Sequence, residues 1–229
     1  MRHTYGRVRV GGTWLAVASG LMIATLLLHG PIAPDLNDQM TRIANRPTVW
    51  AVAHWIAAAG LSIYAVAGLV VLTSESRLTE GWWTTTAWAF LPVTALWTLT
   101  TAVAEATAVT DAVNSGNVEM FEAWWAFAEG KATGFAFLAL AVAVIAGNEA
   151  QSSEGVTPAW AAWTAMVAGV ASFTGWALGM WFEIGLGNLL WLATSILMSV
   201  WVVWFGIALA RSPVSAIATA EARRPLDSE

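Results

Sequence analysis

Ionisable side chains inside apolar stretches are the groups of this sequence that could do chemistry. Lys131, in the stretch AEGKATGF, is the single lysine among ten basic residues, and Glu129 lies two positions before it. Two of the three histidines, His29 and His54, also border or interrupt apolar stretches. A charge at the centre of a bilayer costs about 2.5–3.5 kcal/mol on insertion scales, so it needs a partner or water. These residues therefore point to a buried ion pair, a proton relay or an ion path.

The composition indicates the medium in which these groups lie. Of the 229 residues, 58% are hydrophobic and only 11% are charged, and the mean hydropathy is +0.63. Soluble domains average about 25% charged residues. Apolar stretches of roughly 20 residues, separated by short polar joints, favour transmembrane helices, and many of the 16 tryptophans suit anchoring at the membrane surface. We therefore expect an integral membrane protein in contact with the lipid bilayer.

Charge, cysteine content and motifs exclude several classes of function. A net charge of −5 argues against nucleic-acid binding. The absence of cysteine excludes disulfides, iron–sulfur clusters, thiolate zinc sites and cysteine nucleophiles. The chain contains no Walker motif, nucleophile elbow, HExxH or glycine-rich dinucleotide fingerprint. The sequence therefore favours a protein that is not an enzyme, and we assign no catalytic residue.

The apolar pattern predicts an all-α fold, a polytopic bundle of six transmembrane helices in the cell membrane. The helices are expected at about 13–28, 49–73, 82–107, 119–146, 158–182 and 186–210, within one membrane domain over residues 1–211. Residues 212–229 are expected to form a disordered cytoplasmic tail. Arginine is concentrated in alternate joints, which predicts that both termini are cytoplasmic. The inside then holds Arg2, Arg7, Arg9, Arg77, Arg211, Arg223 and Arg224, and the outside holds Arg42 and Arg46.

This orientation places most ionisable groups in the outer half of the bundle. Glu129 is expected roughly 10 Å deeper than Glu122, because seven helical residues separate them. The cytoplasmic halves contain no comparable set. We therefore predict an acidic vestibule that opens outward, formed by His54, Glu105, Glu122, Glu129, Lys131 and Glu183. The alternative for Glu119, Glu122 and Glu183 is that they are only solvated helix ends.

Helical spacing separates Lys131 from Glu129. Residues two positions apart lie on nearly opposite faces of a helix, so the two side chains do not pair with each other. The partner of Lys131 is expected to be Glu105, Glu183 or a carboxylate of a second protomer. A structural ion pair, a charge in a proton, ion or substrate path, and a contact within a homo-oligomer or membrane complex all stay open.

Two GxxxG pairs predict close helix contacts. Gly130 and Gly134 lie on the fourth expected helix, and Gly175 and Gly179 lie on the fifth. Small residues allow helices to approach closely in a membrane. Because both pairs are expected in the outer half or near the midplane, we predict that these two helices touch there.

The histidines suggest a second kind of site. Two histidines on facing helices can hold a b-type haem, and histidine with glutamate can bind a divalent metal. His29 and His54 are expected to differ in depth by roughly six residues, about 9 Å. A protein without a cofactor is therefore the first expectation, and haem b or a metal on these two residues is the alternative.

The segments between the expected helices also resemble those of a known family. The segment HGPIAPDLNDQMTRIANRP is followed by VAHWIAAAG, and a glutamate ends the third expected helix in VAEATAV. In these features the chain resembles uncharacterised six-helix prokaryotic membrane proteins. Its use of arginine in place of lysine, with an acidic balance, indicates a salt-adapted, haloarchaeal source. The resemblance implies the six-helix fold and carries no activity.

Three functions therefore stay open from the sequence. The first is transport or sensing of a proton, a cation or a small solute through the acidic vestibule. The second is a haem- or metal-binding subunit for electron transfer that uses His54 and His29. The third is a structural or accessory subunit of a membrane complex.

Overall fold

The computed structural model describes residues 2–33, 35–74, 76–128 and 134–212. Within these ranges the chain forms helices and no strand. Five helical stretches are long and apolar enough to cross a membrane, which is the make-up of a multi-pass membrane protein. They comprise α1 (Arg2–His29), α3 (Pro47–Leu72), α4 (Trp82–Ala104) with the π turn η2 (Glu105–Val109) and α5 (Thr110–Asn114), α8 (Ala159–Trp176) with the π turn η3 (Ala177–Trp181), and α9 (Gly185–Arg211).

The fourth expected helix takes the form of two shorter ones. They are α6 (Val118–Ala128) and α7 (Phe135–Gln151). With 17 residues, α7 is about 26 Å long, slightly less than the hydrocarbon core of a bilayer. Residues 129–133 lie outside the described ranges, so the predictions for Glu129, Gly130 and Lys131 fall there.

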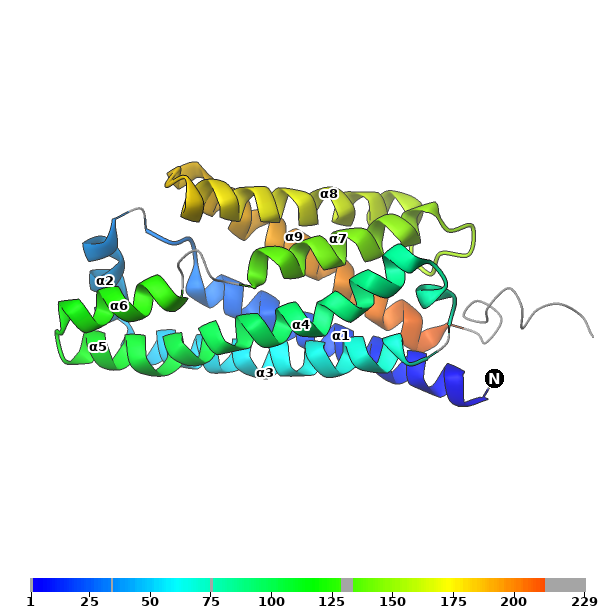
Figure 1. The fold of residues 1–229 in the computed structure, drawn as a ribbon, viewed down its shortest axis with the longest axis horizontal. Coiled ribbons are helices and arrows are strands. Elements are labelled where there is room, and N and C mark those ends of the chain that lie inside the picture. Colours follow the sequence, from blue (N-terminus) through cyan, green and yellow to red (C-terminus); the bar gives the residue numbers. More distant parts are fainter. Residues whose placement is uncertain (1, 34, 75, 129–133, 213–229) are drawn as a thin grey trace, which may run out of the picture.

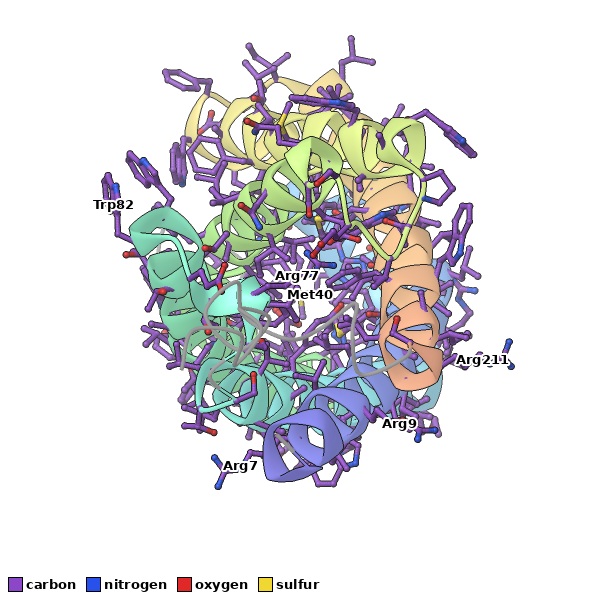
Figure 2. The ribbon with its side chains drawn as sticks, turned by 90° about the vertical axis from the view of Figure 1, so that its right-hand side faces the viewer. Arg7, Arg9, Met40, Arg77, Trp82 and Arg211 are labelled. Carbon is purple, nitrogen blue, oxygen red and sulfur yellow. The ribbon has the colours of Figure 1, made fainter. Side chains whose placement is uncertain are left out.

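Six helices form a closed ring in chain order. Each of α1, α3, α4, α7, α8 and α9 packs against the next, and α9 returns to α1. Figure 2 views this ring along its axis, with side chains filling the centre. The start of α1 and the end of α9 lie at one end, which we call the proximal end (Figure 1). The opposite, distal end carries α2 (Leu36–Ala44), α5 and α6.

Helix limits differ from the expected ones where polar residues continue a helix beyond the membrane. The first helix begins at Arg2 instead of near Thr13, and α7 continues to Gln151 instead of ending near Ala146. The length of an apolar stretch in the sequence predicts only the part of a helix that lipid surrounds. The backbone hydrogen bonds of a helix can continue through polar turns beyond it.

The three described glycines of the GxxxG pairs, Gly134, Gly175 and Gly179, contact other helices than the sequence predicts. A Cβ atom on Gly134 would meet Thr94 and Trp97 of α4. Gly175 and Gly179 face the first turns of α9. Only three residues, 182–184, join η3 to α9, so this short turn brings α8 and α9 together as an antiparallel pair. The contact between α7 and α8 uses Gly169 of α8 instead.

Candidate functional site

His29 and His54 meet inside the distal half of the bundle. Their ring centroids are 5.3 Å apart in an edge-to-face arrangement, and each side chain is only 5% exposed. Gly30 ends α1 directly after His29 with a φ of +69°, a left-handed conformation that suits glycine. The expected 9 Å difference in depth is not present. The chain extends beyond the end of α1 before α3 begins, as the position of α2 shows (Figure 1), and this brings His54 level with His29.

Backbone carbonyl groups orient both imidazole rings. Nδ1 of His29 lies 2.6 Å from the carbonyl oxygen of Gly30, and Nδ1 of His54 lies 2.9 Å from that of Trp50. A carbonyl oxygen can only accept, so Nδ1 donates in both rings. Proton uptake by either neutral ring would then occur at Nε2. Histidines that bind metals or relay protons are commonly oriented in this way.

Trp50 links the two histidines to a buried carboxylate. Its ring centroid lies 4.5 Å from that of His29 and 4.6 Å from that of His54. Its indole N–H donates to Oε2 of Glu105 at 2.9 Å, and Glu105 is fully buried at the start of η2. A tryptophan face within about 6 Å stabilises a cation. A proton on either imidazole would therefore meet an aromatic face that is hydrogen-bonded to a carboxylate.

The hydrogen bond between Trp50 and Glu105 gives a direct stability prediction. We expect Trp50→Phe to lower the free energy of unfolding in detergent by about 1–3 kcal/mol, because a buried carboxylate oxygen loses its donor. Trp55→Phe is the matched control, since Trp55 lies on the same helix and is 52% exposed. Equal thermal stability of the two variants would contradict a structural role for this bond.

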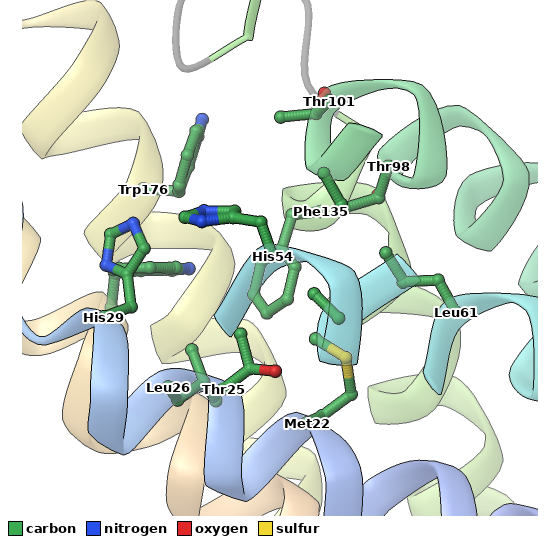
Figure 3. Close-up of a pocket in the computed structure, with 13 residues that line it drawn as sticks. Met22, Thr25, Leu26, His29, His54, Leu61, Thr98, Thr101, Phe135 and Trp176 are labelled. Carbon is green, nitrogen blue, oxygen red and sulfur yellow. The ribbon is translucent and has the colours of Figure 1, made fainter. Parts of the chain in front are cut away.

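A small internal cavity borders the histidine pair. Its volume is about 50 Å³, enough for a few waters at roughly 10–15 Å³ each. Figure 3 shows that its lining comes from several helices, and no lining side chain is more than 8% exposed. The lining comprises Met22, Thr25, Leu26, His29, His54, Ala57, Leu61, Thr98, Thr101, Ala102, Phe135, Trp176 and Trp191.

Among the described residues, two buried indole N–H groups at this cavity have no acceptor. Nε1 of Trp176 and Nε1 of Trp191 have no hydrogen-bond partner in the part of the chain that the structure describes. An unsatisfied buried donor costs about 1–3 kcal/mol, so an acceptor such as water or a small solute would be stabilised nearby. The π turns η2 and η3 begin just beyond Ala102 and Trp176, and π turns are frequent at functional sites.

Of the other predicted site residues, Glu122 and Glu183 lie apart from the cavity, and Glu129 and Lys131 fall outside the described residues. Glu122 is exposed on α6, and Glu183 is exposed in the turn between η3 and α9. Glu119 is exposed as well. The structure therefore brings His29 and His54 together beside the cavity, and Trp50 connects this pair to Glu105.

A haem does not fit this site as it lies. A cavity that holds a few waters is far too small for a porphyrin, so α1, α3 and α9 would have to separate. The described residues also include no group of three or more histidine or carboxylate side chains that could hold a metal ion. The ring orientation leaves Nε2 of each histidine available for hydrogen bonding.

A second buried polar cluster, which the sequence analysis missed, lies at the proximal end. Arg77 and Glu149 form an ion pair at 3.3 Å, with side chains 7% and 1% exposed. The other carboxylate oxygen of Glu149 accepts from the backbone N–H groups of Val156 and Thr157. A pattern in the sequence could have indicated it. The buried positions Leu138, Val142, Ile145 and Ala146 recur at helical spacing, and Glu149 continues that face.

The fold and this site define a multi-pass helical membrane protein with a histidine pair buried at one end. No family model matches this chain, and no curated protein or solved structure is significantly similar to it.

Proposed function

We propose that this chain is a six-helix protein of the cell membrane that binds protons from the outer side on the His29–His54 pair, in order to transport or sense a small solute. The contact between these two imidazoles inside a membrane-spanning bundle carries the proposal. Ionisable side chains are rare in such positions, and histidines there commonly serve proton relays.

The arginine distribution supports an outer position for the histidine pair. The proximal end carries Arg7, Arg9, Arg77 and Arg211. The distal end carries Arg42 and Arg46, in and just after α2 (Figure 1). By the positive-inside rule, the proximal end is then cytoplasmic and the distal end faces outward. Protons would reach the pair from the outer face.

The geometry suits one added proton at a time. Two imidazolium rings at 5.3 Å would repel each other, whereas one positive charge can be balanced by Glu105 through Trp50. The unsatisfied N–H groups of Trp176 and Trp191 offer donors to a water or a solute in the same cavity. Proton uptake and solute binding would thus share one small, buried site.

The test is a pH titration of tryptophan fluorescence in vesicles, carried from neutral pH down to the lowest pH at which the protein stays folded. Imidazolium beside Trp50 quenches its emission, so we expect a quenching step that disappears in His54→Gln and is reduced in His29→Gln. His3→Gln is the control, since His3 lies 26 residues before His29 on α1, about 39 Å away. The same step in all four proteins would overturn the proposal.

Proton flux then separates transport from sensing. Vesicles with a trapped pH dye, placed in an acidic medium, should acidify faster with the protein than without it if the protein is a carrier. His54→Gln should abolish that excess rate. A pH-dependent quenching step without flux would identify a sensor instead.

A further inference from the structure

A groove runs along the outward face of α7 near the proximal end. Its volume is about 480 Å³, and we call it the proximal groove. Its floor is α7, one wall is the start of α4, and the other wall is α8. The residues that line it are Gly81, Trp82, Trp83, Thr84, Leu140, Ala143, Val144, Gly147, Asn148, Gln151, Met166 and Val170.

The groove opens on the perimeter of the bundle. Trp82 and Trp83 are 66% and 63% exposed, and their rings stack at 3.7 Å. Figure 2 shows Trp82 projecting from the flank of the ring. Val144 and Val170 are also exposed, at 39% and 47%. A molecule in this groove would therefore lie between the protein and the surrounding lipid.

Small residues create the hollow. Gly147 and Ala143 lie on the floor between the larger side chains of α7, so the floor has two positions with little or no side chain. A Cβ atom on Gly147 would lie 3.0 Å from the sulfur of Met166, at the far wall. Gly169 of α8 lies against Ala139 and Ala143, which draws α8 close to α7 and leaves the space on the side of α4.

The length of the groove matches one leaflet of a bilayer. From Leu140 to Gln151 the floor spans 11 residue steps, about 16 Å along a helix. Half of the hydrocarbon core of a bilayer is about 15 Å. A molecule that lies along the floor would have one end beside the polar last turn of α7 and the other end inside the adjacent leaflet.

Polarity changes along the groove in the same direction. The exposed amides of Asn148 and Gln151 lie at the proximal end, beside the stacked tryptophans. Leu140, Val144 and Val170 line the part nearer the midplane. Tryptophan pairs of this kind lie at the headgroup level of membranes. The groove is thus polar at its proximal end and apolar toward the midplane. This matches an amphiphile whose polar group lies at the membrane surface and whose apolar tail lies in the bilayer.

We propose that the proximal groove binds one phospholipid of the adjacent leaflet, with an acyl chain along α7 and the headgroup beside Asn148, Gln151 and the tryptophan pair. Phospholipid is the amphiphile that surrounds the perimeter of a membrane-spanning bundle. The site is independent of the histidine pair, which lies at the other end.

A photoreactive phosphatidylcholine with a diazirine in one acyl chain tests this proposal. The purified protein is reconstituted in vesicles that contain this lipid, illuminated, and mapped by peptide mass spectrometry. We expect cross-links to concentrate on residues 140–151 and 166–170. Val170→Trp should abolish them by filling the groove, whereas Val167→Trp should not. Val167 is 60% exposed on the same helix and does not line the groove.

A second variant guards against an effect of the new tryptophan on folding. Gly147→Leu fills the floor from α7, and Gly20→Leu is its control, because Gly20 is exposed on α1 with nothing within 4 Å of an added Cβ atom. Loss of the cross-links in both groove variants alone would support the site. Cross-links spread evenly around the perimeter, or unchanged in both groove variants, would overturn it.

Discussion

We expect Glu149→Ala to lower the free energy of unfolding by about 3–5 kcal/mol, the range seen when one partner of a buried ion pair is removed. The carboxylate of Glu149 pairs with Arg77 through one oxygen and accepts from the backbone of Val156 and Thr157 through the other. It therefore connects α7 to the turn before α4 and to the loop before α8. Thermal unfolding in detergent measures the loss.

Two further variants isolate the cause of this loss. Glu122→Ala removes the same side chain from an exposed position on α6, so its effect should stay within about 0.5 kcal/mol. The double variant Arg77→Met with Glu149→Leu should recover part of the loss, because a well-packed apolar pair often replaces a buried ion pair without cost. A Glu149→Ala protein as stable as Glu122→Ala would contradict the role of the cluster.

The second large effect is expected at the contact between α8 and α9. A Cβ atom on Gly175 would approach backbone atoms of Gly187 and Trp191 closer than 3.0 Å, which real structures essentially never show. Backbone atoms cannot relieve the clash by a change of rotamer, as a side chain can. Gly175→Ala must therefore push α9 away from α8. We expect a loss of about 3 kcal/mol, the upper part of the usual range for overpacking.

The same displacement should disturb the histidine site. Trp191 lines the cavity, and its ring lies 6.0 Å from that of His29. Gly175→Ala should therefore also weaken the pH-dependent quenching step. Gly20→Ala is the control, with open space around the added methyl group, and helix propensity favours alanine over glycine there. A Gly175→Ala protein with wild-type stability and an unchanged titration would show that the two helices do not pack this closely.

Much of the helical pattern follows from local sequence. The helices expected at 49–73 and 186–210 correspond to α3 (Pro47–Leu72) and α9 (Gly185–Arg211). Both are uninterrupted apolar runs, and lipid forces such a run to satisfy its backbone polar groups within a helix. The stretch at 119–146 was harder to predict, because its glycines and charged residues are compatible both with one helix and with the two helices α6 and α7.

The sites depend on distances that local sequence does not contain. His29 and His54 are 25 positions apart, and their contact requires the chain between them to extend beyond the end of α1. Gly175 and Gly187 meet because a turn of three residues closes the α8–α9 pair. Both contacts depend on the three-dimensional positions of the helix ends. A depth estimate that counts residues from an assumed membrane surface does not give these positions.

By itself, the sequence determined that this chain forms apolar helices of membrane length, because hydropathy and helix geometry act over one segment at a time. It also placed ionisable residues within those segments. Only the tertiary structure decided which of them meet. The ring of six helices brought His29, His54 and Trp50 into contact, buried Glu149 against Arg77, and left Glu122 and Glu183 exposed. Packing between segments sets these positions, and it depends on all of the helices at once.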